Sequence, residues 1–241
     1  MSDARLAAAI AEEAGRLLIA IQREGGADAG ARGDAQANRL ILSRLRAARP
    51  DDAILSEESA DDLARLEARR VWIVDPLDGT REFGEGRGDW AVHVALAIDG
   101  APAIGAVALP ARGIVLASDS PPALPAPATP PRMLVSRTRP SQLCSSVRDM
   151  IGAETNGMGS AGAKAMAVVL GEAEIYLHSG GQHQWDNCAP AAVALAAGLH
   201  ASRIDGSRLV YNQRSTSVPD LLICGKEWAD RVLAAVGNGV D

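Results

Sequence analysis

Hydrophobic side chains recur every three to four residues through residues 3–24, and charged residues lie between them. This spacing predicts an amphipathic helix, which Gly25 and Gly26 end. A polar loop, GADAGARGD, follows and leads into a second stretch with helical spacing. Pro50 marks the end of that second helix. The N-terminal part of the chain is therefore expected to begin with two helices.

Short runs of β-prone residues follow these helices. Residues 53–55 and the run Val71–Val74 each predict a strand, and Pro76 is expected to stop the second one. Between Ala91 and Ser118, apolar runs alternate with turn signals. This pattern predicts three strands in an antiparallel meander.

A proline-rich segment, Pro121–Arg132, holds six of the thirteen prolines. Its composition favours an extended connection between an N-terminal half, residues 1–125, and a C-terminal half, residues 126–241. A long surface loop inside one domain is the alternative. Beyond this segment the pattern predicts strands at 133–136 and 219–225, helices at 141–150, 187–202 and 227–236, and a turn, a helix and a strand within 159–177.

Composition and charge narrow the function classes. The chain has 241 residues, of which 47% are apolar but only 3% aromatic, so its core is expected to pack small side chains closely. The net charge of −6 and the lack of a long Lys/Arg run argue against a nucleic-acid polymer as partner. Cys144, Cys188 and Cys224 form no metal or disulfide pattern, and no segment has the length or apolarity of a signal or membrane span. We therefore expect a cytoplasmic protein without a membrane partner.

The segment VWIVDPLDGTREF, residues 71–83, carries the first chemical signal. Asp75 and Asp78 follow a buried-strand pattern, Gly79 permits a tight turn and Thr80 adds a hydroxyl group. Hard oxygen ligands at such a place suit Mg²⁺ beside a phosphate. An ordinary Pro-Asp-Gly turn is the alternative.

The same segment also resembles the Asp-x-Asp-Gly-Thr loop of haloacid-dehalogenase-type phosphatases. There one residue separates the two aspartates, whereas Pro76 and Leu77 separate them here. A shift of one residue on an extended chain reverses the side on which a side chain lies. This spacing disfavours Asp75 as a covalent nucleophile.

Two further acidic positions lie at predicted element boundaries: Glu57 in SEES and Asp186 in QWDNCAP. Taken singly, Glu57 fits a solvated loop carboxylate and Asp186 fits a helix N-cap. Taken with DPLDGT and in this order, they resemble the pattern of the inositol monophosphatase superfamily of magnesium-dependent, lithium-sensitive phosphatases. The resemblance covers almost the whole chain.

This resemblance implies an α+β fold, a layered αβαβα sandwich, and a site for two to three Mg²⁺ ions. Glu57, Asp75 and the Leu77 carbonyl group would bind one ion, and Asp75, Asp78 and Asp186 the second. A third, weaker ion would lie near Glu57. The resemblance also implies a homodimer.

The resemblance implies catalytic roles for Glu57, Thr80 and Asp34. Thr80 and Glu57 would orient and deprotonate a metal-activated water for in-line attack, while the amide groups of Gly79 and Thr80 face the phosphate. Asp34 would partner Thr80 from the loop before the second helix. A helix N-cap is the alternative for Asp34.

Within the superfamily the chain most resembles the CysQ-type 3'(2'),5'-bisphosphate nucleotidases, through DGTREF, LVSRTRP, GSAGAKAM and LVYNQ. His93 is interpreted as a core or sheet-surface histidine, and a surface lysine on an Ala-rich helix is the alternative for Lys164. The implied substrate contacts are Leu77, Asp78, Gly79, Thr80, Ser136, Arg137, Ser160, Lys164, His178 and Asp186.

The implied reaction is the magnesium-dependent removal of the 3'-phosphate of adenosine 3',5'-bisphosphate, giving AMP and phosphate, in sulfur assimilation. The metal core sees only a phosphate, so an inositol-1-phosphate or fructose-1,6-bisphosphate phosphatase is an alternative. A non-catalytic regulator that binds metal or phosphate is a second alternative, of another class.

Overall fold

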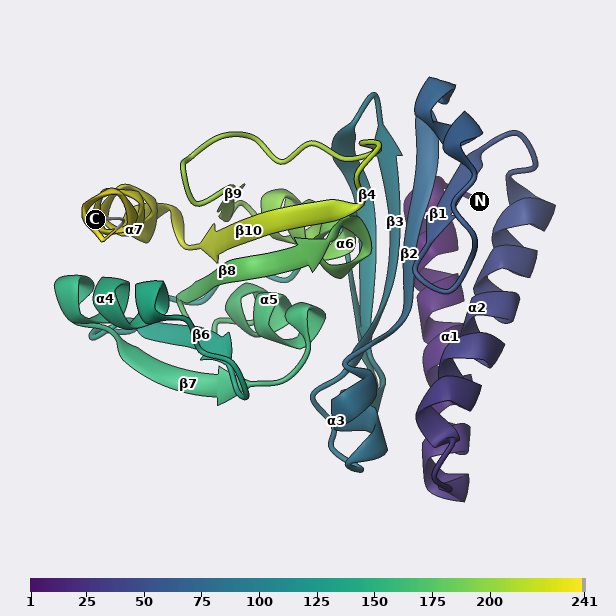
Figure 1. Ribbon diagram of the computed structural model, residues 1–241, viewed down its shortest axis with the longest axis horizontal. Coiled ribbons are helices and arrows are strands. Elements are labelled where there is room, and N and C mark those ends of the chain that lie inside the picture. The colour runs from purple at the N-terminus through teal and green to yellow at the C-terminus, as the bar shows by residue number, and fades with distance from the viewer. Residues whose placement is uncertain (240–241) are drawn as a thin grey trace.

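Two five-stranded sheets organise the chain, and helices lie on both outer sides and between them (Figure 1). The computed structural model describes residues 1–239. From one side to the other, the layers are helices α1 and α2, the first sheet, helices α5 and α6, the second sheet, and helices α4 and α7. This order confirms the αβαβα sandwich that the family resemblance implies.

The first sheet has the strand order β1-β2-β3-β4-β5. Strands β1 and β2 are parallel, and every following pair is antiparallel, which confirms the predicted meander. The elements of this part are α1 (Asp3–Glu24), α2 (Ala29–Ala48), β1 (Ala53–Ser56), η1 (Leu63–Glu67), β2 (Arg70–Asp78), α3 (Thr80–Gly84), β3 (Ala91–Ile98), β4 (Ala101–Leu109), η2 (Pro110–Arg112) and β5 (Ile114–Ala117).

The second sheet has the order β7-β6-β8-β10-β9. Its elements are β6 (Arg132–Ser136), α4 (Gln142–Ile151), β7 (Glu154–Met158), α5 (Ala161–Val169), β8 (Ile175–His183), α6 (Gln184–Ala196), β9 (His200–Ser202), β10 (Ser217–Cys224) and α7 (Lys226–Asn238). The predicted helix 187–202 was too long, because it ends at Ala196 and its last residues form β9. Strand β7 was missed because its residues, ETNGM, are mostly polar and exposed at the sheet edge.

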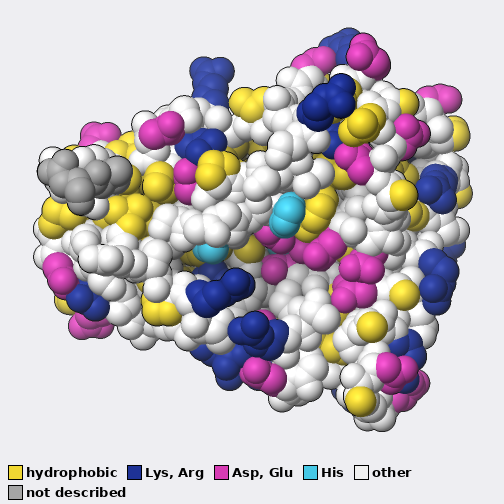
Figure 2. Space-filling model, in the orientation of Figure 1, with side chains coloured by type: hydrophobic (Ala, Val, Ile, Leu, Met, Phe, Trp, Pro, Cys, Tyr) yellow, Lys and Arg dark blue, Asp and Glu magenta, His cyan; other side chains and the backbone are white. Residues whose placement is uncertain are grey.

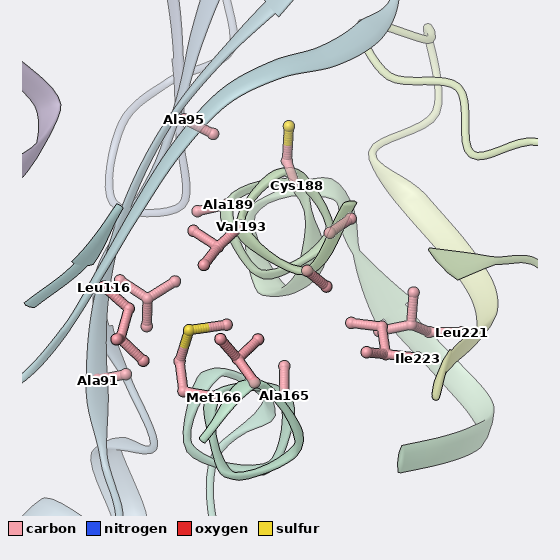
Figure 3. Packing of buried hydrophobic residues seen from close by; sticks show 14 of the residues in the cluster. Ala91, Ala95, Leu116, Ala165, Met166, Cys188, Ala189, Val193, Leu221 and Ile223 are labelled. Carbon is pink, nitrogen blue, oxygen red and sulfur yellow. The ribbon is translucent and has the colours of Figure 1, made fainter. Parts of the chain in front are cut away.

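The central core lies between the sheets. Figure 3 shows Ala91, Ala95 and Leu116 of the first sheet facing α5 and α6, with Leu221 and Ile223 of β10 beyond. The helices approach the sheet so closely that a Cβ atom on Gly105 would lie 2.5 Å from the carbonyl oxygen of Ala189. Small side chains on α6 permit this approach, as the composition suggested.

The proline-rich segment runs between β5 and β6 without helix or strand. It packs against the second half, where Pro125 fills the space beside Gly171. The division of the chain at residue 125 stays a prediction. No helix in residues 1–239 combines the length and the apolarity needed to cross a bilayer.

Candidate active site

Parallel pairing places Glu57 beside Asp75. Ser56, the last residue of β1, pairs with Val74 of β2, and the Glu57 amide donates to the Val74 carbonyl oxygen at 3.2 Å. The residues that follow this pair are Glu57 and Asp75, both acidic. Two carboxylates that are far apart in the sequence become neighbours because the parallel register places residue 57 beside residue 75.

A β-bulge brings Asp78 to the same place. Pro76 does not stop β2 as predicted, because the strand continues to Asp78 with one extra residue between Asp75 and Asp78. On a regular strand, residues three positions apart lie on opposite sides. The extra residue of the bulge removes this reversal, so that both carboxylates reach one site.

Asp186 completes this cluster from the other half of the chain. It lies in the first turn of α6, and ligand oxygens of Asp75, Asp78 and Asp186 all lie within 4.8 Å of one another. Asp186 Oδ2 also accepts a hydrogen bond of 2.6 Å from the His183 amide. The N-cap alternative for Asp186 is wrong, because His183 is the N-cap of α6 and Asp186 is the third residue of the helix. From there its side chain bonds the N-cap amide while it belongs to the acidic cluster.

Crowding of these carboxylates shifts their protonation. Burial raises the pKa of Asp75 well above its usual range, and the charges of Asp78 and Glu57 add to this. Burial likewise raises the pKa of Asp186 to about 6, with a contribution from Asp78. For Glu57, whose side chain reaches solvent, partial burial of the carboxyl group raises the pKa. Such a set of charges calls for a cation.

Asp78 differs from its neighbours because the protein already surrounds it with donors. Its Oδ2 accepts from the Gly162 amide at 2.6 Å and its Oδ1 from the Ala161 amide at 3.2 Å. His93, fully buried, lies 3.2 Å from Oδ2. Although burial acts the other way, the charge of His93 lowers the pKa of Asp78. His93 is thus a core histidine, as interpreted, and it also holds a carboxylate of the cluster.

Asp34 lies inside α2, which corrects the prediction of a loop before that helix and excludes the N-cap alternative. The helix begins earlier than expected because Gly30 and Gly33 are packing positions: a Cβ atom on Gly30 would lie 2.9 Å from Thr80 Cγ2. Asp34 is buried and its Oδ2 accepts from the Thr80 hydroxyl group at 3.3 Å. The same hydroxyl group lies 3.2 Å from the Leu77 carbonyl oxygen. Burial and the charges of the neighbouring glutamates raise the pKa of Asp34 to about 7.

Gly79 forms the turn between β2 and α3. Its φ of +95° lies in the left-handed region, and a Cβ atom there would lie 2.9 Å from Ser160 Cβ. Both the backbone conformation and the space require glycine. The turn therefore places Thr80 at the start of α3, next to the acidic cluster.

A cavity of about 290 Å³ opens beside the cluster. In Figure 2 acidic side chains gather near the middle of this face, with Lys and Arg side chains below and to the left. Leu77, Glu57 and Asp34 do not line this cavity. The predicted substrate contacts that line it are Asp78, Gly79, Thr80, Ser136, Arg137, Ser160, Lys164, His178 and Asp186.

Lys164 is buried, so the alternative of a surface lysine is wrong. Its ammonium group donates to the carbonyl oxygens of Gly159 and Ser160, and it lies 5.2 Å from the centre of the Tyr176 ring. Burial lowers the pKa of Lys164. Two of the three N–H donors of its ammonium group therefore bind the turn before α5.

Other predicted contacts are also engaged within the protein. Arg137 Nη2 donates to Glu82 at 2.9 Å and to Glu85 at 2.8 Å. The hydroxyl group of Ser160 caps α5, and His178 Nε2 lies 3.1 Å from the Gly181 carbonyl oxygen. These residues shape the cavity wall before any ligand enters.

Sequence reasoning missed two exposed arginines at this cavity, Arg81 and Arg139. Neither forms a salt bridge within residues 1–239. Both stand in motifs that carry the resemblance. Arg81 follows the predicted contact Thr80 in DGTREF, and Arg139 lies two residues after the predicted contact Arg137 in SRTRP. They are the cavity's arginines that a ligand can approach without breaking an ion pair.

The residues present fit a hard divalent cation. Carboxylate oxygens and the Leu77 carbonyl group are the donors that Mg²⁺ prefers. Asp34 Oδ1 is buried and has no hydrogen-bond partner in the described part of the chain, which leaves it free for a further ion. The site therefore has the donor chemistry of a metal-dependent hydrolase.

Comparisons with known proteins agree with this geometry. The model of the inositol monophosphatase family matches residues 3–121 and 131–240. The 3'-phosphoadenosine 5'-phosphate phosphatase of Mycobacterium tuberculosis is 52% identical over 94% of this chain and 90% of its own length. The 3'(2'),5'-bisphosphate nucleotidase CysQ of Escherichia coli is 32% identical over 76% of this chain and 79% of its own.

Solved structures show the same fold. CysQ from Bacteroides thetaiotaomicron, a bacterial member of this family, superposes with a TM-score of 0.81 at 24% identity, covering 93% of this chain and 97% of that one. Mycobacterium tuberculosis SuhB superposes with a TM-score of 0.78 at 22% identity, covering 98% and 96%. The chain belongs to the inositol monophosphatase family.

Proposed function

We propose that this protein is a magnesium-dependent phosphatase that removes the 3'-phosphate of adenosine 3',5'-bisphosphate, giving AMP and phosphate. The observation that carries the proposal is a cavity whose lining combines the acidic residues Asp78 and Asp186 with three arginines, Arg81, Arg137 and Arg139. A ligand with two phosphate groups matches this combination, because one phosphate can meet metal ions at the carboxylates and the other a guanidinium group. The 52% identity to a relative named for this substrate supports it.

The proposed cofactor is Mg²⁺, with two to three ions at the site. Glu57, Asp75 and the Leu77 carbonyl group would hold one ion, and Asp75, Asp78 and Asp186 another. Bound in this way, a metal pair supplies charge stabilisation for the attacking and leaving oxygens of an in-line displacement.

The chain's own residues would orient the attacking water. The Thr80 hydroxyl group donates its proton toward the Leu77 carbonyl oxygen or Asp34, which leaves its lone pairs free to accept from a water. Asp34 Oδ2 accepts from this hydroxyl group at 3.3 Å and would hold it in the orientation that receives the water. Glu57, in the loop after β1, lies beside Asp75.

Arg81 and Arg139 would hold the second phosphate. The resemblance implies Lys164 and His178 for the second phosphate or the nucleotide, but in the structure both contact carbonyl oxygens of the cavity wall, those of Gly159 and Gly181. Guanidinium groups without an internal partner bind phosphate without first losing an ion pair.

Side-by-side kinetics tests the function. We expect kcat/KM for adenosine 3',5'-bisphosphate to exceed the values for inositol 1-phosphate and fructose 1,6-bisphosphate, and EDTA to abolish turnover. A higher value for either competitor refutes the substrate assignment. Phosphate release that persists in EDTA or in Asp78→Asn refutes the metal mechanism. A homodimer and a cytoplasmic location accompany this proposal as predictions; sedimentation tests the first and cell fractionation the second.

A further inference from the structure

The loop that carries Glu57, residues 57–62, is exposed, yet a side chain of helix α2 binds its first residues. Asn38, buried on α2, donates through Nδ2 to the Glu58 carbonyl oxygen at 3.0 Å and to Ser59 Oγ at 3.0 Å. This contact fixes the start of the loop to the helix that carries Asp34.

The end of the loop is held by a buried arginine. Arg65, in η1, is 2% exposed and forms two hydrogen bonds with Asp61, at 2.6 and 2.8 Å. Removing a guanidinium group from water is costly unless its donors are satisfied. One loop carboxylate accounts for only part of them.

The remaining donors of Arg65 cross to the second half of the chain. Its Nη1 lies 2.9 Å from Asn212 Oδ1 and 3.1 Å from the Gln213 carbonyl oxygen. Asn212 Nδ2 donates back to the Arg65 carbonyl oxygen at 2.8 Å. Asn212 has a φ of +56°, a left-handed conformation that asparagine tolerates better than most residues. The pair is therefore joined in both directions.

From Asn212 the hydrogen bonds continue to α6. Its amide donates to Gln184 Oε1 at 2.6 Å, and Gln184 Nε2 donates to the Ser215 carbonyl oxygen at 2.8 Å. Gln184 is fully buried and is the first residue of α6, two positions before Asp186. A continuous chain of hydrogen bonds thus runs from the Glu57 loop to the helix that carries Asp186, and it passes through the buried side chains of Arg65 and Gln184.

We propose that Arg65, Asn212 and Gln184 are positioning residues that set the distance between Glu57 and Asp186. These three residues, here called the brace, contact neither the cavity nor the acidic cluster. The inference rests on the proposed function, in which Glu57 and Asp186 hold different ions of one metal pair. The brace would therefore determine the affinity for the pair rather than for the substrate.

The physical reason is the narrow tolerance of Mg²⁺ for ligand geometry. Glu57 lies on an exposed loop after β1 and Asp186 on a helix of the other half, so their separation depends on contacts between the two halves. Residues that orient metal ligands from outside typically contribute about 10- to 100-fold to metal affinity or activity. The brace supplies such a link, and each of its three residues is buried or half-buried.

Two variants of the full-length protein test the brace. Arg65→Met removes the guanidinium group, and Asn212→Gly removes the side chain while permitting the left-handed backbone. We expect Mg²⁺ affinity, measured by titration calorimetry without substrate, to fall about 10- to 100-fold in the first and about 10-fold in the second. Because both act on one network, the double variant should bind Mg²⁺ no more weakly than Arg65→Met alone.

Arg132→Met is the matched control. Arg132 also combines a paired carboxylate, Glu174, with a carbonyl oxygen, that of Gly171, but its bonds stay within the second half. Both arginine variants should lower Tm in EDTA, whereas only Arg65→Met should weaken Mg²⁺ binding. Wild-type Mg²⁺ affinity in Asn212→Gly or Arg65→Met overturns the proposal. Wild-type protein that binds Mg²⁺ but does not hydrolyse adenosine 3',5'-bisphosphate would refute the proposed function alone.

Discussion

His93 connects Asp78 to the backbone beside Asp186. Its Nε2 lies 3.2 Å from Asp78 Oδ2, and its Nδ1 lies 2.9 Å from the Trp185 carbonyl oxygen. The Trp185 carbonyl oxygen accepts a hydrogen bond only from a protonated Nδ1, and a ring that also carries a proton at Nε2 has the positive charge that pairs with Asp78. The charge of Asp78 raises the pKa of His93 against the effect of burial. One buried side chain thus joins a strand of the first sheet to helix α6.

Replacing this ring should damage stability and metal binding together. In His93→Phe the Asp78 carboxylate loses a charged partner inside the core, which typically costs about 3–5 kcal/mol. We expect a lower Tm and an approximately 10-fold weaker Mg²⁺ affinity. His93→Asn, which keeps a donor, should lose less of both. An unchanged Tm in His93→Phe would show that the contact contributes little.

The Thr80 hydroxyl group should be required for turnover but not for the fold. Thr80→Val keeps the shape and removes the oxygen that lies between Leu77 and Asp34, so kcat should fall by about 100- to 10,000-fold, with Thr80→Ser close to wild type. Thr138→Val, at the same cavity, is the control and should retain activity. Equal rates for Thr80→Val and Thr80→Ser would exclude the hydroxyl group from the mechanism.

The metal-free protein should lose stability as pH rises from about 4 to about 7. The pKa of Asp34 is raised to about 7 and that of Asp186 to about 6, both from 3.8. In this window the folded chain binds protons that the unfolded chain has released, so the free energy of unfolding falls with pH. Each group contributes at most about 1.4 kcal/mol per pH unit.

Thermal unfolding in EDTA across this window measures the effect. Asp34→Asn should flatten the upper part of the curve, and Mg²⁺, which binds ionised carboxylates, should oppose the loss at neutral pH. A Tm in EDTA that rises steadily from about pH 4 to about pH 7 would contradict the assignment.

Arg139 and Arg81 should determine selectivity for a second phosphate. We expect Arg139→Ala to lower kcat/KM for adenosine 3',5'-bisphosphate by about 10-fold, through lost charged hydrogen bonds, and to leave hydrolysis of adenosine 3'-monophosphate unchanged. Arg81→Ala should act in the same direction. Arg5→Ala, exposed on α1, is the control. Equal losses on both substrates would indicate a general effect on the site.

Much of the fold was predictable because its helices and strands have clear hydrophobic periods. The acidic cluster was also accessible, since its aspartates stand in a motif whose order along the chain can be read directly. Prediction failed where local signals were overridden by packing. Gly30 and Gly33 suggested a loop but lie in α2, where close contact needs them. Pro76 suggested a strand end but lies in a bulge.

The cavity wall was harder to predict because the roles of its residues depend on partners distant in the sequence. Lys164 looked like a surface residue or a phosphate ligand, whereas carbonyl oxygens of Gly159 and Ser160 surround it. Nothing in the sequence pairs Arg137 with Glu82, 55 positions away, or frees Arg139. The hydrogen bonds of the brace join residues up to 148 positions apart, and no hydrophobic period in the sequence indicates such pairs.

The close approach of α6 to the first sheet has a consequence for inherited variation in this protein. Because the helix backbone touches Gly105, adding even one methyl group there would push outward the same helix that presents Asp186. Ala189 and Ala192 carry no functional group. Nevertheless, natural selection should remove substitutions by larger side chains at these positions as strictly as it removes changes in the acidic motif. Surveys of loss-of-function alleles should therefore find substitutions of small residues deep in the central layer alongside those of the carboxylates.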